Sequence, residues 1–248
     1  MQRMIQLIKI VLLVSLVALP VNINLSATPL NLDLSAPDCN NCNICPVREK
    51  MIFPEDDYEY RWAFVFLYGW QLEGVMNKAM RFSLPLSEGE QRSRLYTGEV
   101  SYQLKRQNVV RRMLQPILST MEVAANYTWR DDPNGQIQEF NPYLRFTWNN
   151  FPWNKYLITA LTLGEGLSYA TGFTSRETRD TIKANDVRRL LNFFMLEAAF
   201  SLPKIPQWQA VYRIHHRSGM FGLYAPGIVG STAIQIGVRY QHFQDYTR

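Results

Sequence analysis

The chain has 248 residues, of which 19% are charged and 13% aromatic, and 26 basic against 21 acidic side chains give a net charge of +5. This small, unclustered excess does not favour a nucleic-acid-binding protein, and the composition excludes a disordered, collagen-like or coiled-coil chain. The mean hydropathy of −0.19 excludes a polytopic helical membrane protein. A soluble β-rich domain and a membrane β-barrel remain, since barrel strands conceal their hydrophobicity by alternation.

The N-terminus has the pattern of an export signal. Basic Arg3 and Lys9 precede an apolar run over 10–21, which is too short to span a bilayer, and the small residues Ser26 and Ala27 follow. We therefore expect residues 1–27 to be a signal peptide that is removed on export, although the sequence does not fix the point of cleavage.

All three cysteines lie in the next segment, residues 28–60, as Cys39, Cys42 and Cys45 with the spacing C-x-x-C-x-x-C. A structural metal site usually needs a fourth ligand, and no histidine lies nearby. Export also favours oxidised thiols. We interpret this segment as a flexible periplasmic leader with one local disulfide and one spare thiol, and we assign it no function.

From residue 61 to residue 248 the chain alternates large apolar side chains with polar ones at a period of two, as β-strands do. In the first such run, Phe64, Phe66 and Tyr68 share one face. Further runs follow, and together they predict eight strands, the smallest usual number for a transmembrane barrel. The predicted strands cover residues 62–70, 96–104, 121–129, 144–148, 157–171, 190–202, 207–218 and 232–243.

Two features favour a membrane barrel over a soluble barrel that binds an apolar ligand. The polar face carries charges deep inside strands, at Glu99, Glu122, Arg145 and Arg239, which suits a salt-bridged interior. The apolar face ends in aromatic residues, as interfacial girdles do. The tryptophans of this kind are Trp62, Trp70, Trp129, Trp148, Trp153 and Trp208. The predicted fold is an all-β, eight-stranded antiparallel up-and-down transmembrane β-barrel over residues 61–248.

The connections follow from counting strands. With both termini in the periplasm, the segments 73–94, 173–189 and 219–231 lie outside the cell, and these are the longer ones. The sequence DDPNG at 131–135 predicts a tight hairpin between the third and fourth strands. The periplasmic connection 105–118 is longer than expected and basic, and it is predicted to hold a short helix.

The seventh predicted strand carries the main functional signal. Arg213, His215 and Arg217 share one face, and three basic side chains in hydrocarbon would each cost roughly 2–4 kcal/mol near the midplane. This face must therefore point inward, which turns His216 and Ser218 toward lipid. Two residues apart on one face, an imidazole and a hydroxyl can lean together as an activated nucleophile. The alternative is a histidine and a serine that merely lie at the membrane interface.

The segment from 212 to 219, with 237–240 of the last strand, resembles the C-terminal part of PagL-type lipid A 3-O-deacylases, an acyloxyacyl hydrolase-like family of outer-membrane barrels. The residues are YRIHHRSG and GVRY, and GEGLSY at 164–169 matches less specifically. The resemblance implies an enzyme of the bacterial outer membrane in which Ser218 attacks the ester of a 3-hydroxyacyl chain of lipid A and His216 takes the serine proton. It implies lipid A of lipopolysaccharide as the partner and no metal or organic cofactor, while a homodimer is left open.

The chain departs from the family pattern at two places. Gly219 stands where the family has an asparagine, so the oxyanion would depend on backbone N–H groups such as those of Gly219 and Gly222. The family's glutamate about a dozen residues after the serine is missing, and the sequence there is Gly-Ser-Thr at 230–232. Ser231 is one candidate for the third member, and Glu197 is another, although its parity points inward. The alternative function is a non-catalytic outer-membrane barrel with a structural or surface-interaction role.

Overall fold

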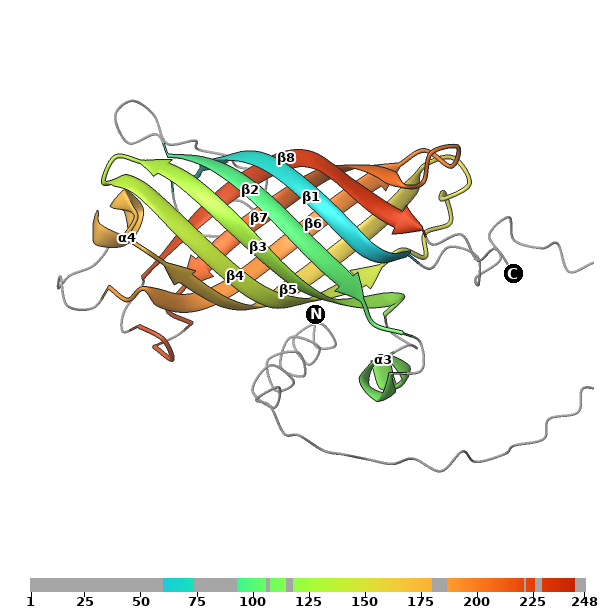
Figure 1. Cartoon of the computed structure of the whole chain (residues 1–248), viewed down its shortest axis with the longest axis horizontal. Helices are drawn as coiled ribbons and strands as arrows, with labels where there is room; N and C mark the ends of the chain where they lie inside the picture. The colour runs from blue at the N-terminus through green and yellow to red at the C-terminus, as the bar shows by residue number, and fades with distance from the viewer. Residues whose placement is uncertain are drawn as a thin grey trace, which may run out of the picture. The chain divides into compact units, whose positions relative to one another are not determined.

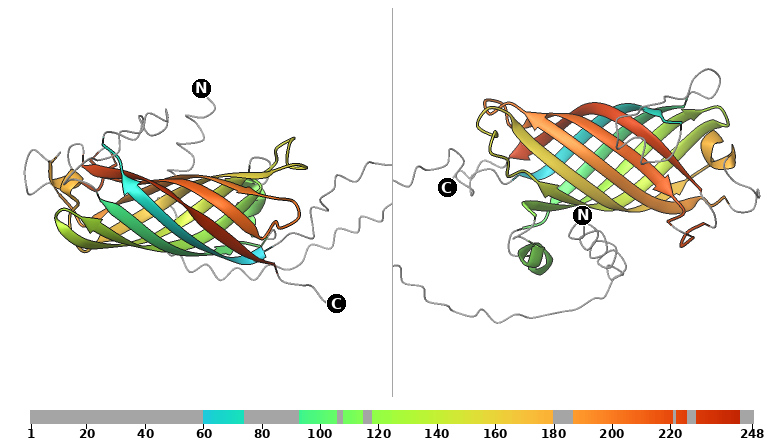
Figure 2. Two further views of the ribbon diagram at one scale, coloured as in Figure 1. Left: turned by 90° about the horizontal axis from the view of Figure 1, so that it is seen from above. Right: turned by 180° about the vertical axis from the view of Figure 1, so that it is seen from behind.

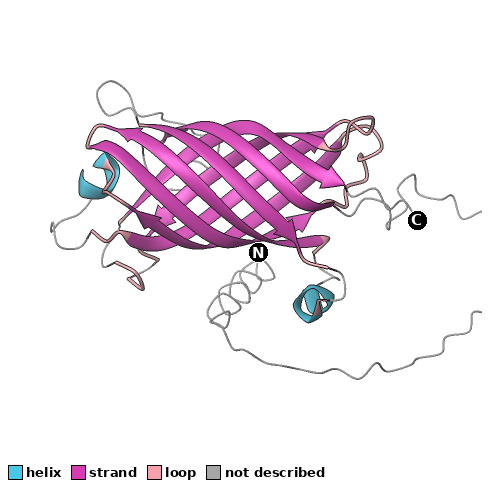
Figure 3. Ribbon diagram, viewed as in Figure 1, coloured by secondary structure: helices cyan, strands magenta, loops and turns pink. Residues whose placement is uncertain are grey.

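The computed structural model describes residues 60–73, 93–105, 108–114, 118–179, 187–220, 222–225 and 229–243. Each strand pairs antiparallel with its sequence neighbour, and the last pairs with the first, so the sheet closes into a barrel of eight strands, drawn in Figure 1 and in magenta in Figure 3. The predicted fold class is confirmed. The strands are β1 (Tyr60–Gln71), β2 (Arg94–Gln103), β3 (Thr120–Asp132), β4 (Gly135–Trp148), β5 (Ile158–Ala170), β6 (Leu190–Ser201), β7 (Trp208–Ser218) and β8 (Gly230–Phe243).

The barrel has two rims that differ in their connections. We call the rim where β1 begins and β8 ends the terminal rim, because Tyr60 pairs there with Phe243. The opposite rim, where β7 ends, we call the loop rim. It includes the predicted hairpin, in which Asp132 pairs with Gly135 and Gly135 takes a positive φ of 108° that favours glycine. The predicted basic helix is also present, as α3 (Val109–Leu114).

A second short helix, α4 (Ser175–Arg179), lies in the β5–β6 connection at the loop rim (Figure 1). It is tied to the β3–β4 hairpin, because the backbone N–H of Ser175 donates to Asp132 Oδ1 over 2.8 Å. Its Glu177 is fully buried and forms an ion pair of 3.1 Å with Arg217 of β7. The helix therefore adds a charge to the interior at this rim.

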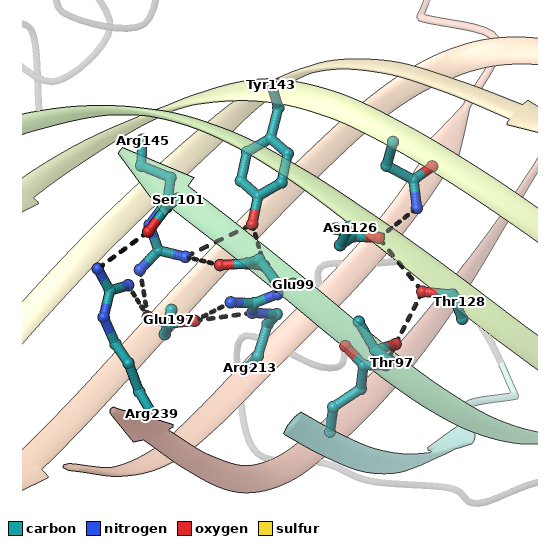
Figure 4. Close-up of polar contacts among 12 residues, drawn as sticks. Thr97, Glu99, Ser101, Asn126, Thr128, Tyr143, Arg145, Glu197, Arg213 and Arg239 are labelled. Atoms are coloured by element: carbon teal, nitrogen blue, oxygen red, sulfur yellow. Dashed lines mark hydrogen bonds and ion pairs between the residues drawn. The ribbon is translucent and has the colours of Figure 1, made fainter. Parts of the chain in front are cut away.

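The middle of the barrel interior is filled by buried ion pairs (Figure 4). Arg145 contacts three carboxylates, those of Glu99 at 2.8 Å, Glu122 at 3.2 Å and Glu197 at 2.6 Å. The other two arginines of this cluster complete the balance of three cations and three anions: Arg213 pairs with Glu99 and Glu197, and Arg239 pairs with Glu122 at 2.6 Å. The salt-bridged interior predicted from the polar strand faces is confirmed.

A second polar cluster lies in the interior toward the loop rim. Glu139 pairs with Arg130 at 2.8 Å and with Nε2 of His215 at 2.9 Å, and Arg217 lies beside it. Arg213, His215 and Arg217 are all fully buried. The three basic residues of β7 thus face inward, as predicted from the free-energy cost of a basic side chain in lipid.

The exterior is apolar and aromatic. Phe66, in the middle of β1, is 68% exposed. Aromatic rings meet at both rims, for example Trp62 with Tyr102 at the terminal rim, with centroids 4.9 Å apart, and Tyr96 with Trp129 at the loop rim, 5.4 Å apart. A charged interior inside an apolar wall with aromatic ends is typical of transmembrane barrels.

The predicted signal peptide and the cysteine leader lie outside the described residues, so both stay predictions. No described helix is long and apolar enough to cross a membrane. Within the described ranges, no group of His, Cys, Asp and Glu side chains is arranged to hold a metal ion.

Candidate active site

The candidate site lies on the outer wall of the barrel at the loop end of β7. Strands β5 to β8 lie side by side there, as the right-hand view of Figure 2 shows. His216 and Ser218 are both half-buried, and they alternate with Arg213, His215 and Arg217, which are buried in the interior. Both side chains therefore belong to the outward face of β7, the orientation that the sequence predicted.

His216 is held by a residue that the sequence analysis did not select. Its Nδ1 lies 2.9 Å from Oγ1 of Thr232, which is its cross-strand partner on β8 and is only 3% exposed. When Nδ1 carries the proton and donates it to Thr232, Nε2 keeps the lone pair that a general base needs. The threonine thus fixes one side of the ring and leaves the other for a hydroxyl.

Neither side chain suggested as a third member contacts this ring. Ser231 pairs with Arg217 in the strand register, which turns its side chain inward, where its hydroxyl donates to Glu177 over 3.3 Å. Glu197 belongs to the central interior cluster, where it binds Arg145 and Arg213. The reason is parity, because adjacent positions on a strand face opposite sides of the wall.

Gly230 occupies the position a dozen residues after Ser218, and its surroundings leave no room for a side chain. A Cβ at Gly230 would lie 2.4 Å from the carbonyl oxygen of Arg217. Strands β7 and β8 approach too closely at this point for any side chain without a backbone shift. The neighbouring outward position, Thr232, is therefore the one that can reach the histidine.

The hydroxyl of Ser218 has no hydrogen-bond partner within the described part of the chain. Catalytic hydrogen bonds are often long or misaligned without substrate and tighten when it binds. Ser218 pairs with Asn192 of β6 on one side and with Gly230 of β8 on the other. The hydroxyl therefore sits on the wall between two strands.

One of the two suggested oxyanion donors is already engaged. The N–H of Gly219 donates to the carbonyl oxygen of Val229 over 2.8 Å, so it continues the strand pairing and is not available for an oxyanion. Gly222 lies in the following turn with a positive φ of 93°, and its N–H has no partner among the described residues. Of the two glycines, only Gly222 has an N–H without a partner in the part of the chain that the structure describes.

A buried carboxyl group also belongs to this outer wall, although the sequence analysis did not select it. Glu165 of β5 pairs with Leu144 and Phe194, which both lie on the outward face, so its side chain points outward. It is only 6% exposed, and its Oε1 accepts a hydrogen bond from Nδ2 of Asn192. The signal in the sequence was a single acidic residue on an otherwise apolar face, between Leu163 and Leu167.

The phenol of Tyr224, in the turn after β7, interacts electrostatically with this carboxyl group. Burial raises the pKa of the Tyr224 phenol, and the charge of Glu165 raises it further. The backbone N–H of Tyr224 donates to the carbonyl oxygen of Gly219 over 3.0 Å, which folds the turn back toward the end of β7. The outer wall here carries two polar contacts, His216 with Thr232 and Glu165 with Asn192, and Asn192 is the cross-strand partner of Ser218.

No family model and no curated protein matches this chain. Solved structures are similar to it at low identity. The outer-membrane enzyme PagL is 9% identical with a TM-score of 0.47, covering 73% of this chain and 99% of its own. A de novo designed transmembrane β-barrel is 9% identical with a TM-score of 0.40, covering 75% and 99%. Ail of Yersinia pestis is 11% identical with a TM-score of 0.34, covering 73% and 100%.

Proposed function

We propose that this chain is a bacterial outer-membrane barrel that hydrolyses the ester of a 3-hydroxyacyl chain on lipid A of lipopolysaccharide. The observation that carries the proposal is the placement of His216 and Ser218 on the outward face of β7, with Nδ1 of the histidine bound to Thr232. A nucleophile on the lipid-facing wall suits a substrate that is itself a membrane lipid.

The distribution of side chains supports the membrane location. Large apolar residues cover the exterior, and the charged side chains inside the barrel are paired. The loop rim carries the two longest connections, β1–β2 and β5–β6, which supports an orientation with this rim outside the cell and Ser218 at the level of the outer leaflet. Lipid A lies in that leaflet, so its ester carbonyls can reach the wall beside β7.

The reaction follows the logic of a serine esterase. Ser218 Oγ attacks the ester carbonyl while Nε2 of His216 takes the hydroxyl proton, and the oxyanion accepts a hydrogen bond from the N–H of Gly222. The same histidine then protonates the departing sugar oxygen, which leaves an acyl-enzyme. A water molecule then attacks the acyl-enzyme ester while His216 takes one of its protons. His216 passes this proton to the oxygen of Ser218 as the fatty acid is released.

Thr232 acts as a positioning residue through its contact with Nδ1. A neutral hydroxyl orients the ring but stabilises the imidazolium less than a carboxylate does, and loss of the carboxylate costs on the order of 10⁴ in rate in a serine-protease triad. We therefore expect slow turnover, which a reaction confined to a membrane surface tolerates because enzyme and substrate stay together.

Mass spectrometry of lipid A tests the proposal. Cells that make the wild-type chain should lose one ester-linked hydroxyacyl chain from lipid A, and cells that make Ser218→Ala should keep it, because the nucleophile is gone. Ser168→Ala is the matched control, since Ser168 of β5 faces the interior and its hydroxyl has no partner among the described residues. It should behave as wild type.

Heat-modifiable migration on gels should show that all three proteins are folded barrels in the membrane fraction. Identical acylation with wild type and Ser218→Ala would eliminate the hydrolase and leave the alternative, a barrel with a structural or surface-interaction role.

A further inference from the structure

Glu165 stands at a position where a membrane barrel normally has an apolar residue. It lies five residues before the end of β5 and faces outward, in line with Leu161, Leu163 and Leu167. An ionisable side chain at membrane depth is costly and is by default a sign of function. The interior ion pairs do not explain it, because it faces away from them.

The contacts of this carboxyl group leave one oxygen available. Oε1 accepts a hydrogen bond from Nδ2 of Asn192, and the same nitrogen donates to the carbonyl oxygen of Gly166 over 3.2 Å. Both amide protons of Asn192 are thus used to fix the carboxyl group. Within the described residues Oε2 has no partner. Glu165 and Asn192 are 6% and 5% exposed, so the pair is shielded by protein.

The strand register puts this pair next to the nucleophile and away from the imidazole. Asn192 is the direct cross-strand partner of Ser218, and such partners on one face have Cβ atoms about 4.5–5.5 Å apart. Phe194 pairs with both Glu165 and His216 and stands between them. Glu165 therefore cannot serve as the acid behind the histidine, whose Nδ1 is bound to Thr232 on the other side.

In its ionised form Glu165 can only accept hydrogen bonds, so a ligand of this carboxylate must carry a donor. The phosphates of lipid A are anionic and would be repelled. The methylene groups of an acyl chain have no donor, whereas a hydroxyl on the third carbon does, and it lies two carbons from the carbonyl that Ser218 attacks. We propose that Glu165, held by Asn192, is the subsite that recognises the hydroxyl group of the 3-hydroxyacyl chain; this assignment rests on the proposed function.

Competitive lipid binding tests the subsite without any need for cleavage. Full-length Ser218→Ala protein, refolded in detergent, is offered equal amounts of two glucosamine lipids, one with a 3-hydroxydodecanoyl ester and one with a dodecanoyl ester, and bound lipid is counted by native mass spectrometry. Because a site that is built to hydrogen-bond a hydroxyl leaves a buried acceptor unpaired with the other lipid, we expect roughly a 10-fold preference for the hydroxylated lipid.

A second substitution, Glu165→Leu, in the Ser218→Ala protein should reduce the ratio of hydroxylated to plain lipid bound to about 1, since the acceptor is lost. Glu165→Gln keeps a carbonyl oxygen and should retain part of it, which guards against a misfolded leucine variant. The matched control is Leu167→Ala, which changes the next outward residue on β5, the direct cross-strand partner of Asn192, and should keep the full preference.

The outcomes separate the two proposals. Equal binding of the lipids, no binding of either, or an unchanged preference in folded Glu165→Leu would each overturn the subsite. A wild-type chain that cleaves neither lipid, while Ser218→Ala still selects the hydroxylated one through Glu165, would overturn the hydrolase and keep the subsite. Equal binding of both lipids, together with their cleavage at equal rates, would overturn the subsite and keep the hydrolase.

Discussion

In the proposed hydrolase, the hydroxyl of Thr232 takes the place that a carboxylate holds in a full triad, and its contribution can be isolated by one substitution. Thr232→Val keeps the shape of the side chain but removes the partner of His216 Nδ1. We expect kcat to fall roughly 10-fold with KM little changed, because ring orientation matters mainly in the transition state. Steady-state hydrolysis of a hydroxyacyl ester in detergent measures both constants.

The hydroxyl alone is responsible only if Thr232→Ser restores kcat. A purely structural role would instead change the melting behaviour of the barrel in both variants, with no separation of kcat from KM. If valine left kcat at the wild-type value, the positioning role of Thr232 would be wrong.

Two strand glycines with different surroundings test how closely the strands pack. A Cβ at Gly166 of β5 would lie 2.3 Å from the carbonyl oxygen of Pro142, whereas at Gly98 of β2 the nearest atom is a ring carbon of Phe66, 4.0 Å away. Gly166→Ala should therefore destabilise the barrel by about 1–3 kcal/mol through backbone displacement. Gly98→Ala should stay within about 0.5 kcal/mol of wild type.

Urea-dependent loss of the fast-migrating folded form on gels compares the two variants. Because Gly166 accepts the hydrogen bond from Asn192, Gly166→Ala should also disturb the Glu165 pair, and Gly98→Ala should not. Equal stability of the two variants would contradict the close approach of β4 and β5.

Alternation along each strand predicted eight strands, although the fourth, predicted over 144–148, begins at Gly135, and it did not predict how the strands align. The eight strands, the hairpin at 131–135 and the helix over 109–114 follow from local patterns. Which face of β7 points inward was predicted from the free-energy cost of placing three basic side chains in lipid.

The partners of His216 depend on the register between strands, which a single strand does not encode. Ser231 and Thr232 are adjacent in sequence, and only the pairing of β7 with β8 decides which of them meets the imidazole. Glu165 was missed for a related reason: its neighbours along β5 are apolar, and its partner Asn192 lies on another strand. Whether the Gly219 N–H is free to donate likewise depends on its pairing with Val229, which the sequence of one strand does not show.

At the scale of the whole barrel, the centre of the interior holds charges that balance one another, beside small buried apolar clusters such as that of Val65, Leu67 and Val211. In the central cluster Glu99, Glu122 and Glu197 face Arg145, Arg213 and Arg239, so the formal charge is zero. The apolar surface needed for stability in a bilayer lies outside. The outward face of β7 can therefore carry polar side chains while the interior charges stay paired.

This balance gives a sharp test of stability, because removing one partner of a buried ion pair leaves a charge without compensation. Arg145→Met takes one cation away from three carboxylates and should cost about 3–5 kcal/mol of unfolding free energy. Arg145→Met combined with Glu122→Gln keeps the cluster neutral and should recover much of the loss. Urea titration of folded barrel in detergent measures both variants, and similar stability of the single and double variants would show that charge balance does not hold the interior together.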